Sequence, residues 1–460
     1  MALNKRHNIC RDTDFYKITQ VGLDPVDVEY IMEYTMARKD RVQFFGLQYL
    51  MMEYLSGYVV TQEKIDIAEK RFKLNGGFDY FPKERWEYIL KAHDGKLPIS
   101  IRAVPEGTIV PTRGVMFTVV NTDPECAWLV PYIESILLKV WKPSSVATYG
   151  LNIQEMLRDK AYISGEEVPL CMDNDFGYRG ASTEEEAQIC GAAHLLNSRG
   201  SDTCVGEDLL IDYYGANPGW LLSVRATEHH TMQTREKENE QEAYENIIDL
   251  TPPEAILSIV TDTWDYEYAQ EVMLGKELHD KILARAGKVV FRPDSGDPVE
   301  VAVKSLEQIR DAFGYTINKN GFIINNPKVG LLMGDQINAD MMEKVLNAIM
   351  LKGYGISNLC FGMGGARYSL TRDTYGFTTK ECAFCQNGVW HDTCKTPKGS
   401  EFKKSVGGRL KLVVDENTGK LVTRTYEEPG EDIMVEVFRD GNITKKWTFE
   451  EILKNATMYK

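Results

Sequence analysis

Residues 168–188 run VPLCMDNDFGYRGASTEEEAQ, an apolar stretch that stops at the polar cluster DNDFGYRG before a helical pattern begins. The same order of apolar run, polar cluster and helix recurs about every 30 residues, the length of one strand, one helix and two short loops. The other runs are LLSVRATEHH, ILSIVTDTWD, KVVFRPDSGDP, VGLLMGDQ and NLCFGMGG, with RGSDT at residues 199–203 as a weaker seventh. This alternation predicts an α/β protein with a parallel sheet.

The polar clusters all fall at the carboxyl ends of the predicted strands. In α/β barrels and in open α/β sheets alike, ligands bind at that edge. We therefore expect the chemistry of the protein to lie in the loops that follow the runs.

The two ends of the chain do not share this pattern. Residues 1–150 combine amphipathic helices such as FFGLQYLMMEYLSGYV with the β-rich piece LPISIRAVPEGTIVPTRGVMFTVVN, whereas residues 381–460 consist of strands and turns. We expect residues 151–380 to form an α/β barrel that carries the active site. The segments 1–150 and 381–460 are expected to combine into one α+β domain.

Composition excludes several functional classes. The 53 basic and 68 acidic residues give a net charge of −15, which repels nucleic acid and anionic membranes. No apolar stretch is long enough to cross a bilayer, and the start MALNKRHNIC lacks the apolar core of a signal peptide. The nine cysteines are scattered and odd in number, which is typical of reduced thiols. We expect a cytoplasmic enzyme.

One group of cysteines has a spacing that resembles a zinc site. Cys382, Cys385, His391 and Cys394 read C-x2-C-x5-H-x2-C. The intervening loop is short, and the first two cysteines lie in KECAFCQNGVW, which has the pattern of a strand. This context favours ordinary core or strand cysteines.

Two features of the strand ends indicate that phosphate binds there. Arg179 and Gly180 precede a helix for which Ser182 and Glu185 predict a capping box, so that a guanidinium lies beside a helix N-terminus. The glycines of FGMGG, residues 361–365, allow the backbone to approach a phosphate closely.

Acids mark the same edge of the predicted sheet. Asp262, Asp294 and Asp335 follow three different runs, where they could hold ribose hydroxyls or a metal ion bound to diphosphate oxygens. Any one of them could equally be a helix N-cap. Their equivalent positions favour a polar, metal-assisted site.

A histidine pair follows the run LLSVRATEHH. Glu228 directly precedes His229, and a carboxylate so placed could orient or charge an imidazole. The neighbouring His230 lies only one residue further from the predicted strand end and from Glu228. The pattern leaves open which histidine is functional.

The chain resembles the nicotinamide phosphoribosyltransferases, a branch of the type II phosphoribosyltransferase family, from about residue 9 onward. The similar segments are DTDFYKITQ, FFGLQYL, LPISIRAVPEGTIVPTRG, DFGYRGASTEEEAQICGAAHLLNSRGSDT, ATEHHTM, VTDTWD, FRPDSGDP, MGDQIN, FGMGG and GGRLKL. The resemblance implies an irregular α/β barrel, a second domain built from both chain ends, and a homodimer with two shared active sites. The implied reaction joins nicotinamide to 5-phosphoribosyl 1-diphosphate in NAD salvage, with magnesium and with ATP hydrolysis coupled through a phosphohistidine.

The resemblance also implies roles for individual residues. Phe176 and, from the partner subunit, Tyr16 would stack on the pyridine ring; Asp202 would accept from its carboxamide, and Arg292 would lie beside them. Asp262 and Asp294 would hold ribose hydroxyls and the magnesium diphosphate, and His229 would be phosphorylated. The implied phosphoribosyl and diphosphate residues are Arg179, Gly334, Asp335, Gly364, Gly365, Arg38, Arg372, Lys380, Lys395 and Lys403.

Some positions depart from the family pattern. Arg225 stands where proline is common, and Ala366 replaces a third glycine after Gly365. These departures leave the core reaction in place but bear on the ATP coupling and on any channel that leads out of the site.

The residue types favour the amide over the acid. Asp202 suits a carboxamide that donates N–H and would repel a carboxylate. The alternative within the same fold is nicotinate phosphoribosyltransferase. More distant alternatives are a catalytically silent protein that acts through its dimer surface and a barrel enzyme that acts on another phosphosugar.

Overall fold

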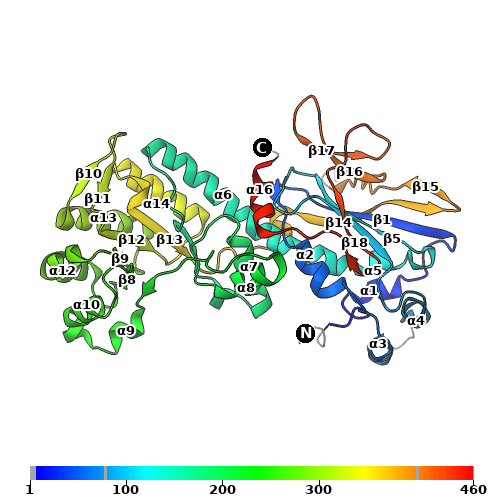
Figure 1. Cartoon of the computed structure of the whole chain (residues 1–460), viewed down its shortest axis with the longest axis horizontal. Coiled ribbons are helices and arrows are strands. Elements are labelled where there is room, and N and C mark those ends of the chain that lie inside the picture. Colours follow the sequence, from blue (N-terminus) through cyan, green and yellow to red (C-terminus); the bar gives the residue numbers. More distant parts are fainter. Residues whose placement is uncertain (1–6, 77–79, 400–402, 459–460) are drawn as a thin grey trace. The chain divides into compact units, whose positions relative to one another are not determined.

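The computed structural model describes residues 7–76, 80–399 and 403–458. The chain divides into two compact units, each seen in Figure 1 by its labelled elements. One, here called the barrel unit, comprises Tyr149–Leu209 and Asn217–Ser369, and the other, the terminal unit, comprises Met1–Thr148, Leu210–Ala216 and Leu370–Lys460. The boundaries 150 and 380 expected from the sequence stay a prediction, because compactness alone does not define a folding domain.

Six parallel strands form the sheet of the barrel unit, and each comes from one of the six apolar runs. Their order in the sheet is β6 (Asp173–Asp175), β13 (Leu359–Met363), β12 (Val329–Met333), β9 (Val289–Arg292), β8 (Leu257–Val260) and β7 (Arg225–Ala226). Every pairing along this order is parallel. The prediction of a parallel α/β sheet is confirmed.

Isolated bridges continue the sheet past β6 and curl it. Asp175 pairs with Ser201 and Gly200 pairs with Leu222, both in parallel. Leu222 lies three residues before β7, the strand at the opposite edge of the sheet from β6. The bridges therefore connect the two edges of the sheet. The weaker run RGSDT thus supplies a short seventh strand-like segment of the sheet. The expected irregular α/β barrel is confirmed.

Helices connect the strands of the barrel unit. They are α6 (Trp141–Ser164), α7 (Glu184–His194), α8 (Cys204–Tyr214), α9 (His229–Gln233), α10 (Glu240–Asp249), α11 (Tyr266–Tyr268) with η7 (Ala269–Glu277), α12 (His279–Ala284), α13 (Pro298–Phe313) and α14 (Ala339–Leu351). A short hairpin, β10 (Tyr315–Ile317) and β11 (Ile323–Asn325), follows α13. Both α6 and α8 continue into the terminal unit.

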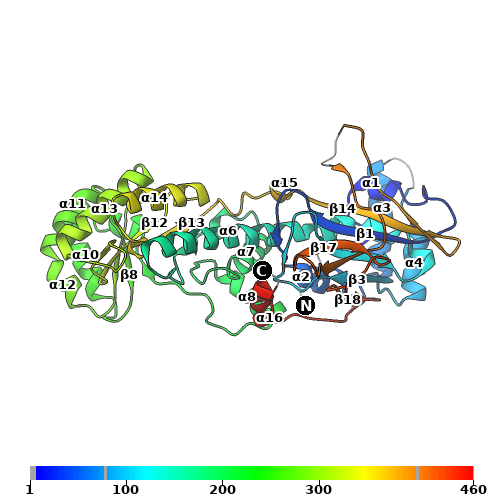
Figure 2. The same ribbon diagram turned by 90° about the horizontal axis from the view of Figure 1, so that it is seen from above.

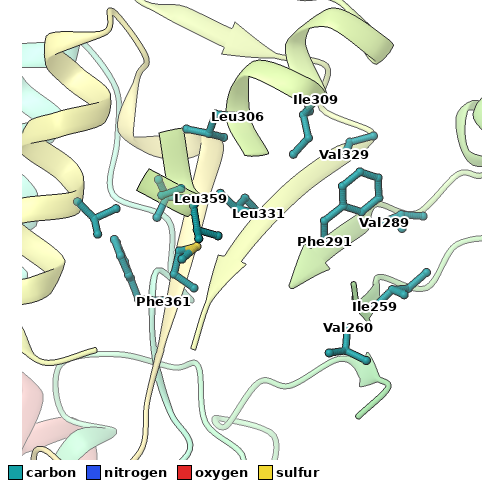
Figure 3. Close-up of a cluster of buried hydrophobic side chains, with 14 of the residues drawn as sticks. Ile259, Val260, Val289, Phe291, Leu306, Ile309, Val329, Leu331, Leu359 and Phe361 are labelled. Atoms are coloured by element: carbon teal, nitrogen blue, oxygen red, sulfur yellow. The ribbon is translucent and has the colours of Figure 1, made fainter. Parts of the chain in front are cut away.

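The core of the barrel unit is packed between strands and helices. Phe291 of β9, Leu331 of β12 and Phe361 of β13 are buried, and α13 adds Leu306 and Ile309 to the same cluster (Figure 3). Burying such apolar surface is the main driving force of folding. It holds the strands rigidly, so their carboxyl ends have fixed relative positions.

The sheet of the terminal unit mixes strands from both ends of the chain (Figure 2). Its order is β15 (Val389–Asp392), β14 (Phe377–Gln386), β1 (Val28–Ala37), β5 (Val115–Asn121), β3 (Ile99–Ala103), β18 (Val435–Arg439) and β19 (Asn442–Ile443). All of its pairings are antiparallel. Two further pairs are β2 (Val42–Gln43) with β4 (Ile109–Val110), and β16 (Leu410–Val414) with β17 (Leu421–Thr425).

The helices of the terminal unit are α1 (Phe15–Thr19), α2 (Leu47–Leu50) with η2 (Met51–Leu55), α3 (Gln62–Gly76), α4 (Lys83–Ala92), α5 (Leu129–Leu137), α15 (Arg372–Tyr375) and α16 (Phe449–Met458). Across the described residues of both units, no helix combines the length and the apolar character that a membrane crossing requires.

Candidate active site

The loops that follow the parallel strands line one cavity of about 670 Å³ in the barrel unit. Nine of the residues singled out from the sequence lie on its wall: Phe176, Arg179, Asp202, His229, Arg292, Asp294, Gly334, Asp335 and Gly364. Tyr178, Ala226, Thr227 and Glu228 complete the lining. The convergence expected from the strand ends is therefore present in the structure.

Phe176 lies at the end of β6 against the backbone of β13. A Cβ atom on Gly362 would come within 2.0 Å of the Phe176 ring, so only glycine leaves room for the ring there. The Phe176 amide donates to the Met363 carbonyl oxygen at 3.0 Å, which fixes the backbone that carries the ring. The sequence reasoning assigned the glycines of FGMGG to phosphate and missed this packing role of Gly362.

Asp202 is held from two sides. Its amide donates to the Asp175 carbonyl oxygen at 2.8 Å, and its Oδ1 accepts a hydrogen bond from Ser223 Oγ. The carboxylate itself is exposed on the cavity wall. Ser223 was not recognised from the sequence, because a serine before β7 has no pattern that distinguishes it from a surface residue.

Arg292 and Asp294 form an ion pair at the end of β9. Arg292 Nε lies 3.2 Å from Asp294 Oδ2, while Arg292 Nη2 donates to the Thr227 carbonyl oxygen at 2.7 Å. Burial raises the pKa of Asp294, and Arg292 partly opposes that rise. Asp294 Oδ1 is buried without a hydrogen-bond partner among the described residues. Such an oxygen is costly to desolvate, so it suits a ligand that donates to it.

Gly334 keeps the approach to Asp294 open. A Cβ atom at this position would lie 3.1 Å from Asp294 Oδ1, closer than most Cβ contacts. Asp335 follows directly and is exposed on the same wall. The Gly334 backbone therefore lies beside the carboxylate of Asp294, with Asp335 next to it on the cavity lining.

His229 begins α9 and contacts Asp262 across the strand ends. Its Nε2 lies 3.1 Å from Asp262 Oδ1, and Ser295 Oγ donates to Asp262 Oδ2. Glu228 instead contacts His230, with its Oε1 2.8 Å from His230 Nδ1, and exchanges capping contacts with Thr231. The expectation that Glu228 orients His229 is wrong, because Glu228 is the N-cap of α9 and turns toward its own helix.

Arg179 lies in the turn before α7. That helix begins at Glu184 with Thr183 as its N-cap, whose hydroxyl accepts from the Glu186 amide at 3.1 Å. Glu186 in turn accepts from the Ser182 amide at 2.8 Å. The predicted capping box of Ser182 and Glu185 is wrong by one residue, because Thr183 and Glu186 offer the same groups one position later.

The two loops for which the sequence predicts phosphate binding, after β6 and after β13, lie close to each other. A Cβ atom on Gly180 would be 3.5 Å from the Gly365 Cα atom. Gly365 is exposed beside Gly364, although it does not line the cavity itself. The loops after β6 and β13 thus present backbone and a guanidinium on one side of the cavity.

The remaining residues singled out from the sequence belong to the terminal unit. Tyr16, 59% exposed, and Arg372 line a second, polar cavity of about 450 Å³, in which Lys17 and Glu134 form an ion pair. Lys380 is partly buried, and burial lowers its pKa. Arg38, directly after the last residue of β1, is partly exposed, whereas Lys395 and Lys403 are exposed.

Among the described residues, one group of three side chains has its ligand-type atoms close enough together to hold a metal ion. It consists of His93, Asp123 and Cys126 in the terminal unit. Asp123 Oδ2 accepts from Tyr88 and lies 2.7 Å from His93 Nε2, so a structural hydrogen-bond network accounts for the group. Cys382 and Cys385 are both buried in strand β14, which confirms the strand interpretation of that motif.

Comparisons with known proteins agree with this geometry. The sequence profile of the nicotinate phosphoribosyltransferase (NAPRTase) family matches residues 171–430, and that of the nicotinamide phosphoribosyltransferase N-terminal domain matches residues 8–101. Nicotinamide phosphoribosyltransferase of Xanthomonas campestris pv. campestris is 34% identical over 98% of both chains. The enzyme of the same name from Acinetobacter baylyi is 32% identical over 97% of this chain and 96% of its own.

Solved structures show the same fold. Nicotinate-nucleotide pyrophosphorylase from Pyrococcus furiosus superposes with a TM-score of 0.63 at 14% identity, covering 98% of this chain and 95% of its own. Human nicotinic acid phosphoribosyltransferase gives a TM-score of 0.57 at 15% identity, covering 97% and 93%. At these identities the likeness concerns the fold alone.

Proposed function

Because the chain belongs to the nicotinate phosphoribosyltransferase (NAPRTase) family, we propose that it is a nicotinamide phosphoribosyltransferase. It would join nicotinamide to 5-phosphoribosyl 1-diphosphate and release nicotinamide mononucleotide and diphosphate, a step of NAD salvage. The observation that carries this proposal is the meeting of Phe176, Asp202 and Asp294, from three different strand ends, on one cavity wall. An aromatic face, an amide acceptor and a ribose acceptor are the groups that this reaction needs.

The pyridine is proposed to lie against Phe176 with its carboxamide toward Asp202. An aromatic face holds the ring without using its nitrogen lone pair, which is the nucleophile. Nicotinamide is neutral and attacks directly, so no general base is required. The chain's task is to hold the nitrogen close to the anomeric carbon, and such positioning alone supplies a large part of a rate enhancement.

The phosphoribosyl group is proposed to extend from the pyridine along the rest of the cavity lining. Arg179 and the backbone at Gly364 and Gly365 would bind the 5′-phosphate, while Asp294 would accept from a ribose hydroxyl. Gly334 and Asp335 would lie along the sugar. Arg292 fixes Asp294 and leaves its Oδ1 directed to the substrate side.

Magnesium would enter with the diphosphate. Hard carboxylate oxygens are its preferred protein ligands, and Asp294 on the cavity lining, with Asp262 near it, would supply them to an ion held mainly by substrate oxygens. When bound, the ion neutralises charge on the departing diphosphate. Asp262 meanwhile keeps His229 and Ser295 in place.

His229 is proposed to accept a phosphoryl group from ATP. It lines the cavity with Nε2 beside Asp262, whereas His230 contacts Glu228 and is not itself part of the lining. We expect His229→Ala to abolish ATP hydrolysis while slow nucleotide synthesis continues, because the pyridine and phosphoribosyl groups keep their contacts. Phosphate release and mononucleotide formation would be measured separately.

His230→Ala is the matched control for this prediction. It removes a neighbouring imidazole without touching the cavity, so both activities should persist. Undiminished ATP hydrolysis in His229→Ala would assign the phosphoryl acceptor to another residue.

The direct test of the proposed function is incubation of the purified chain with nicotinamide, phosphoribosyl diphosphate and magnesium, with and without ATP, followed by identification of the product. Nicotinamide mononucleotide is expected, at a higher yield with ATP. A parallel incubation with nicotinic acid tests the alternative, nicotinate phosphoribosyltransferase, which the family profile also favours. Faster turnover of the acid would establish that alternative.

The terminal unit is proposed to complete the site of a second subunit in a homodimer. Tyr16 would stack on the free face of the pyridine, and the basic residues Arg38, Arg372, Lys380, Lys395 and Lys403 would contribute to the diphosphate and nucleotide surface. The exposed ring of Tyr16, beside Arg372 in the polar cavity, supports this proposal.

Co-expression of Tyr16→Ala and Asp202→Ala chains tests the shared site. If each site combines a barrel from one subunit with Tyr16 of the other, mixed dimers contain one intact site, and random pairing restores about a quarter of wild-type activity. Each variant alone should be nearly inactive. Activity of the mixture no higher than the mean of the two variants would contradict a shared site.

A further inference from the structure

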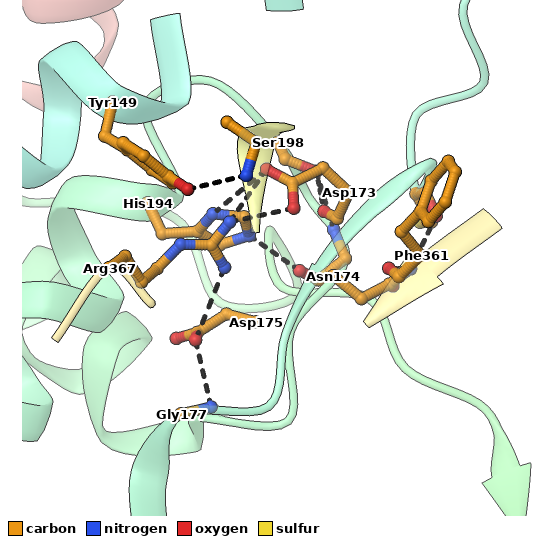
Figure 4. A network of polar contacts seen from close by, with 12 residues as sticks. Tyr149, Asp173, Asn174, Asp175, Gly177, His194, Ser198, Phe361 and Arg367 are labelled. Carbon is orange, nitrogen blue, oxygen red and sulfur yellow. Dashed lines mark hydrogen bonds and ion pairs between the residues drawn. The ribbon is translucent and has the colours of Figure 1, made fainter. Parts of the chain in front are cut away.

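A buried ionic network joins β6 to the segment that follows β13 (Figure 4). Arg367 is 0% exposed, and its Nη2 donates to both carboxylate oxygens of Asp173 at 2.8 Å. Its Nη1 lies 3.4 Å from Asp175 Oδ1. None of the three side chains lines the cavity.

Asp175 connects this network to the pyridine side. Its Oδ1 accepts from the Gly177 amide at 3.0 Å, inside the loop that carries Phe176 and Arg179. Its carbonyl oxygen accepts from the Asp202 amide at 2.8 Å. One residue therefore fixes the backbone of both proposed nicotinamide contacts.

Arg367 and Tyr368 connect the same network to the phosphate side. They lie two and three residues after Gly365, and the Tyr368 amide donates to the Gly365 carbonyl oxygen at 3.1 Å. The Tyr368 hydroxyl donates to Asp175 Oδ2 at 3.1 Å. The Tyr368 ring also fills the space over Gly177, where a Cβ atom would lie 1.9 Å from the ring.

Fold stability alone gives a poor reason for burying these charges. Desolvation offsets much of the attraction in a buried ion pair, and apolar residues of similar size often give equal or greater stability. Charged hydrogen bonds do, however, fix distances and directions more narrowly than apolar packing does.

We propose that Arg367, with Asp173 and Asp175, is a positioning group that sets the spacing between the nicotinamide-holding and phosphate-holding loops. This inference rests on the proposed function of the cavity. It assigns the network no contact with substrate and no chemical step.

The test separates positioning from stability. Arg367→Met leaves two buried carboxylates without their cation, so it should lower the melting temperature by roughly 5–10 °C. The pair Asp173→Leu with Arg367→Met removes the cation and one of the two carboxylates, so it should restore part of that loss. Asp175 keeps its hydrogen bonds from the Gly177 amide and the Tyr368 hydroxyl. The paired variant should nevertheless have a KM for both substrates at least about tenfold above wild type, since small misplacements weaken reaction geometry strongly.

Arg285→Met is the matched control. Arg285 is also buried in the barrel unit, but it donates to the backbone carbonyl oxygens of Ile248, Thr251, Pro252 and Ala255 rather than to the cavity loops. It should lose stability with unchanged KM values. Arg367→Lys keeps the charge and should show a smaller rise in KM, so it serves if the paired variant does not fold.

Recovery of wild-type KM values together with stability in the paired variant would overturn the positioning role and leave a purely structural one. Wild-type turnover is measured first in the same assay, and its absence would refute the proposed function instead. Calorimetric titration with phosphoribosyl diphosphate gives a readout that needs no turnover. There, an affinity in the paired variant equal to that of wild type would equally overturn the inference.

Discussion

Replacing Asp294 with asparagine is expected to lower kcat/KM for phosphoribosyl diphosphate by about a thousandfold, the upper range for loss of one charged group aimed at a transition state. The substitution keeps the side-chain volume and removes only the charge. Asp294 Oδ1 is buried without a partner among the described residues, which leaves it available for the ribose hydroxyl of the proposed complex.

The same substitution should not destabilise the fold. Burial raises the pKa of Asp294, and the nearby Asp262 raises it further. A carboxyl group whose pKa is higher in the folded than in the unfolded state lowers stability above its unfolded pKa, and that loss disappears as the pH falls through the folded pKa. At neutral pH, asparagine removes this unfavourable ionisation, although it also weakens the contact with Arg292.

Activity has the opposite pH dependence. In the proposed role of Asp294 the ionised carboxylate is the form that binds, and burial raises its pKa, so the acid limb of kcat/KM in wild type should lie above the pH typical of an unperturbed aspartate. That limb should be absent from the small residual activity of the variant. Steady-state kinetics across pH, with thermal unfolding at each pH, measure both effects.

Asp280→Asn is the control for this prediction. Asp280 is a fully exposed acid on α12 and has no contact with the cavity. It should leave kcat/KM unchanged. Wild-type activity in Asp294→Asn would contradict the proposed role of the carboxylate.

Asp202→Asn is expected to reduce the preference for nicotinamide over nicotinic acid by about a hundredfold, because like charges held in contact cost several kcal/mol. In the proposed complex, a carboxylate at this position accepts from the amide N–H and repels the acid. Asparagine still offers an oxygen to the amide but no longer repels the acid, so the change should come mainly from faster turnover of nicotinic acid.

The measurement is kcat/KM for both pyridines with wild type and variant. Ser223→Ala serves as the control, since it removes the hydroxyl that donates to Asp202 Oδ1 while keeping the charge. Its preference for the amide should remain. A preference in Asp202→Asn equal to that of wild type would show that discrimination lies elsewhere.

The repeating runs predicted the barrel and its chemical edge because strand periodicity and polar run ends are local signals. Phe176, Asp202, His229 and Asp294 could thus be placed on one wall from sequence and family resemblance. The contact of Asp262 with His229 and the packing of Phe176 on Gly362 could not, since they join distant segments through side-chain geometry.

The buried network shows the same limit more strongly. Arg367 and Asp173 are 194 positions apart, and a charged residue after FGMGG looks like a solvated loop residue in the sequence. Both side chains are buried only because the segment after β13 folds back against β6. The helix start at Thr183 was missed for a different reason: adjacent hydroxyls and a run of glutamates allow the same cap in neighbouring registers.

The interleaved sheet of the terminal unit has a consequence for synthesis on the ribosome. β1 is hydrogen-bonded to β14, and β3 to β18, so early strands wait for segments translated more than 300 residues later. The barrel segment is complete before those late strands emerge. A nascent chain therefore carries a complete barrel segment together with unpaired strand edges. Until translation ends, these edges are prone to aggregation and are sites for chaperone binding.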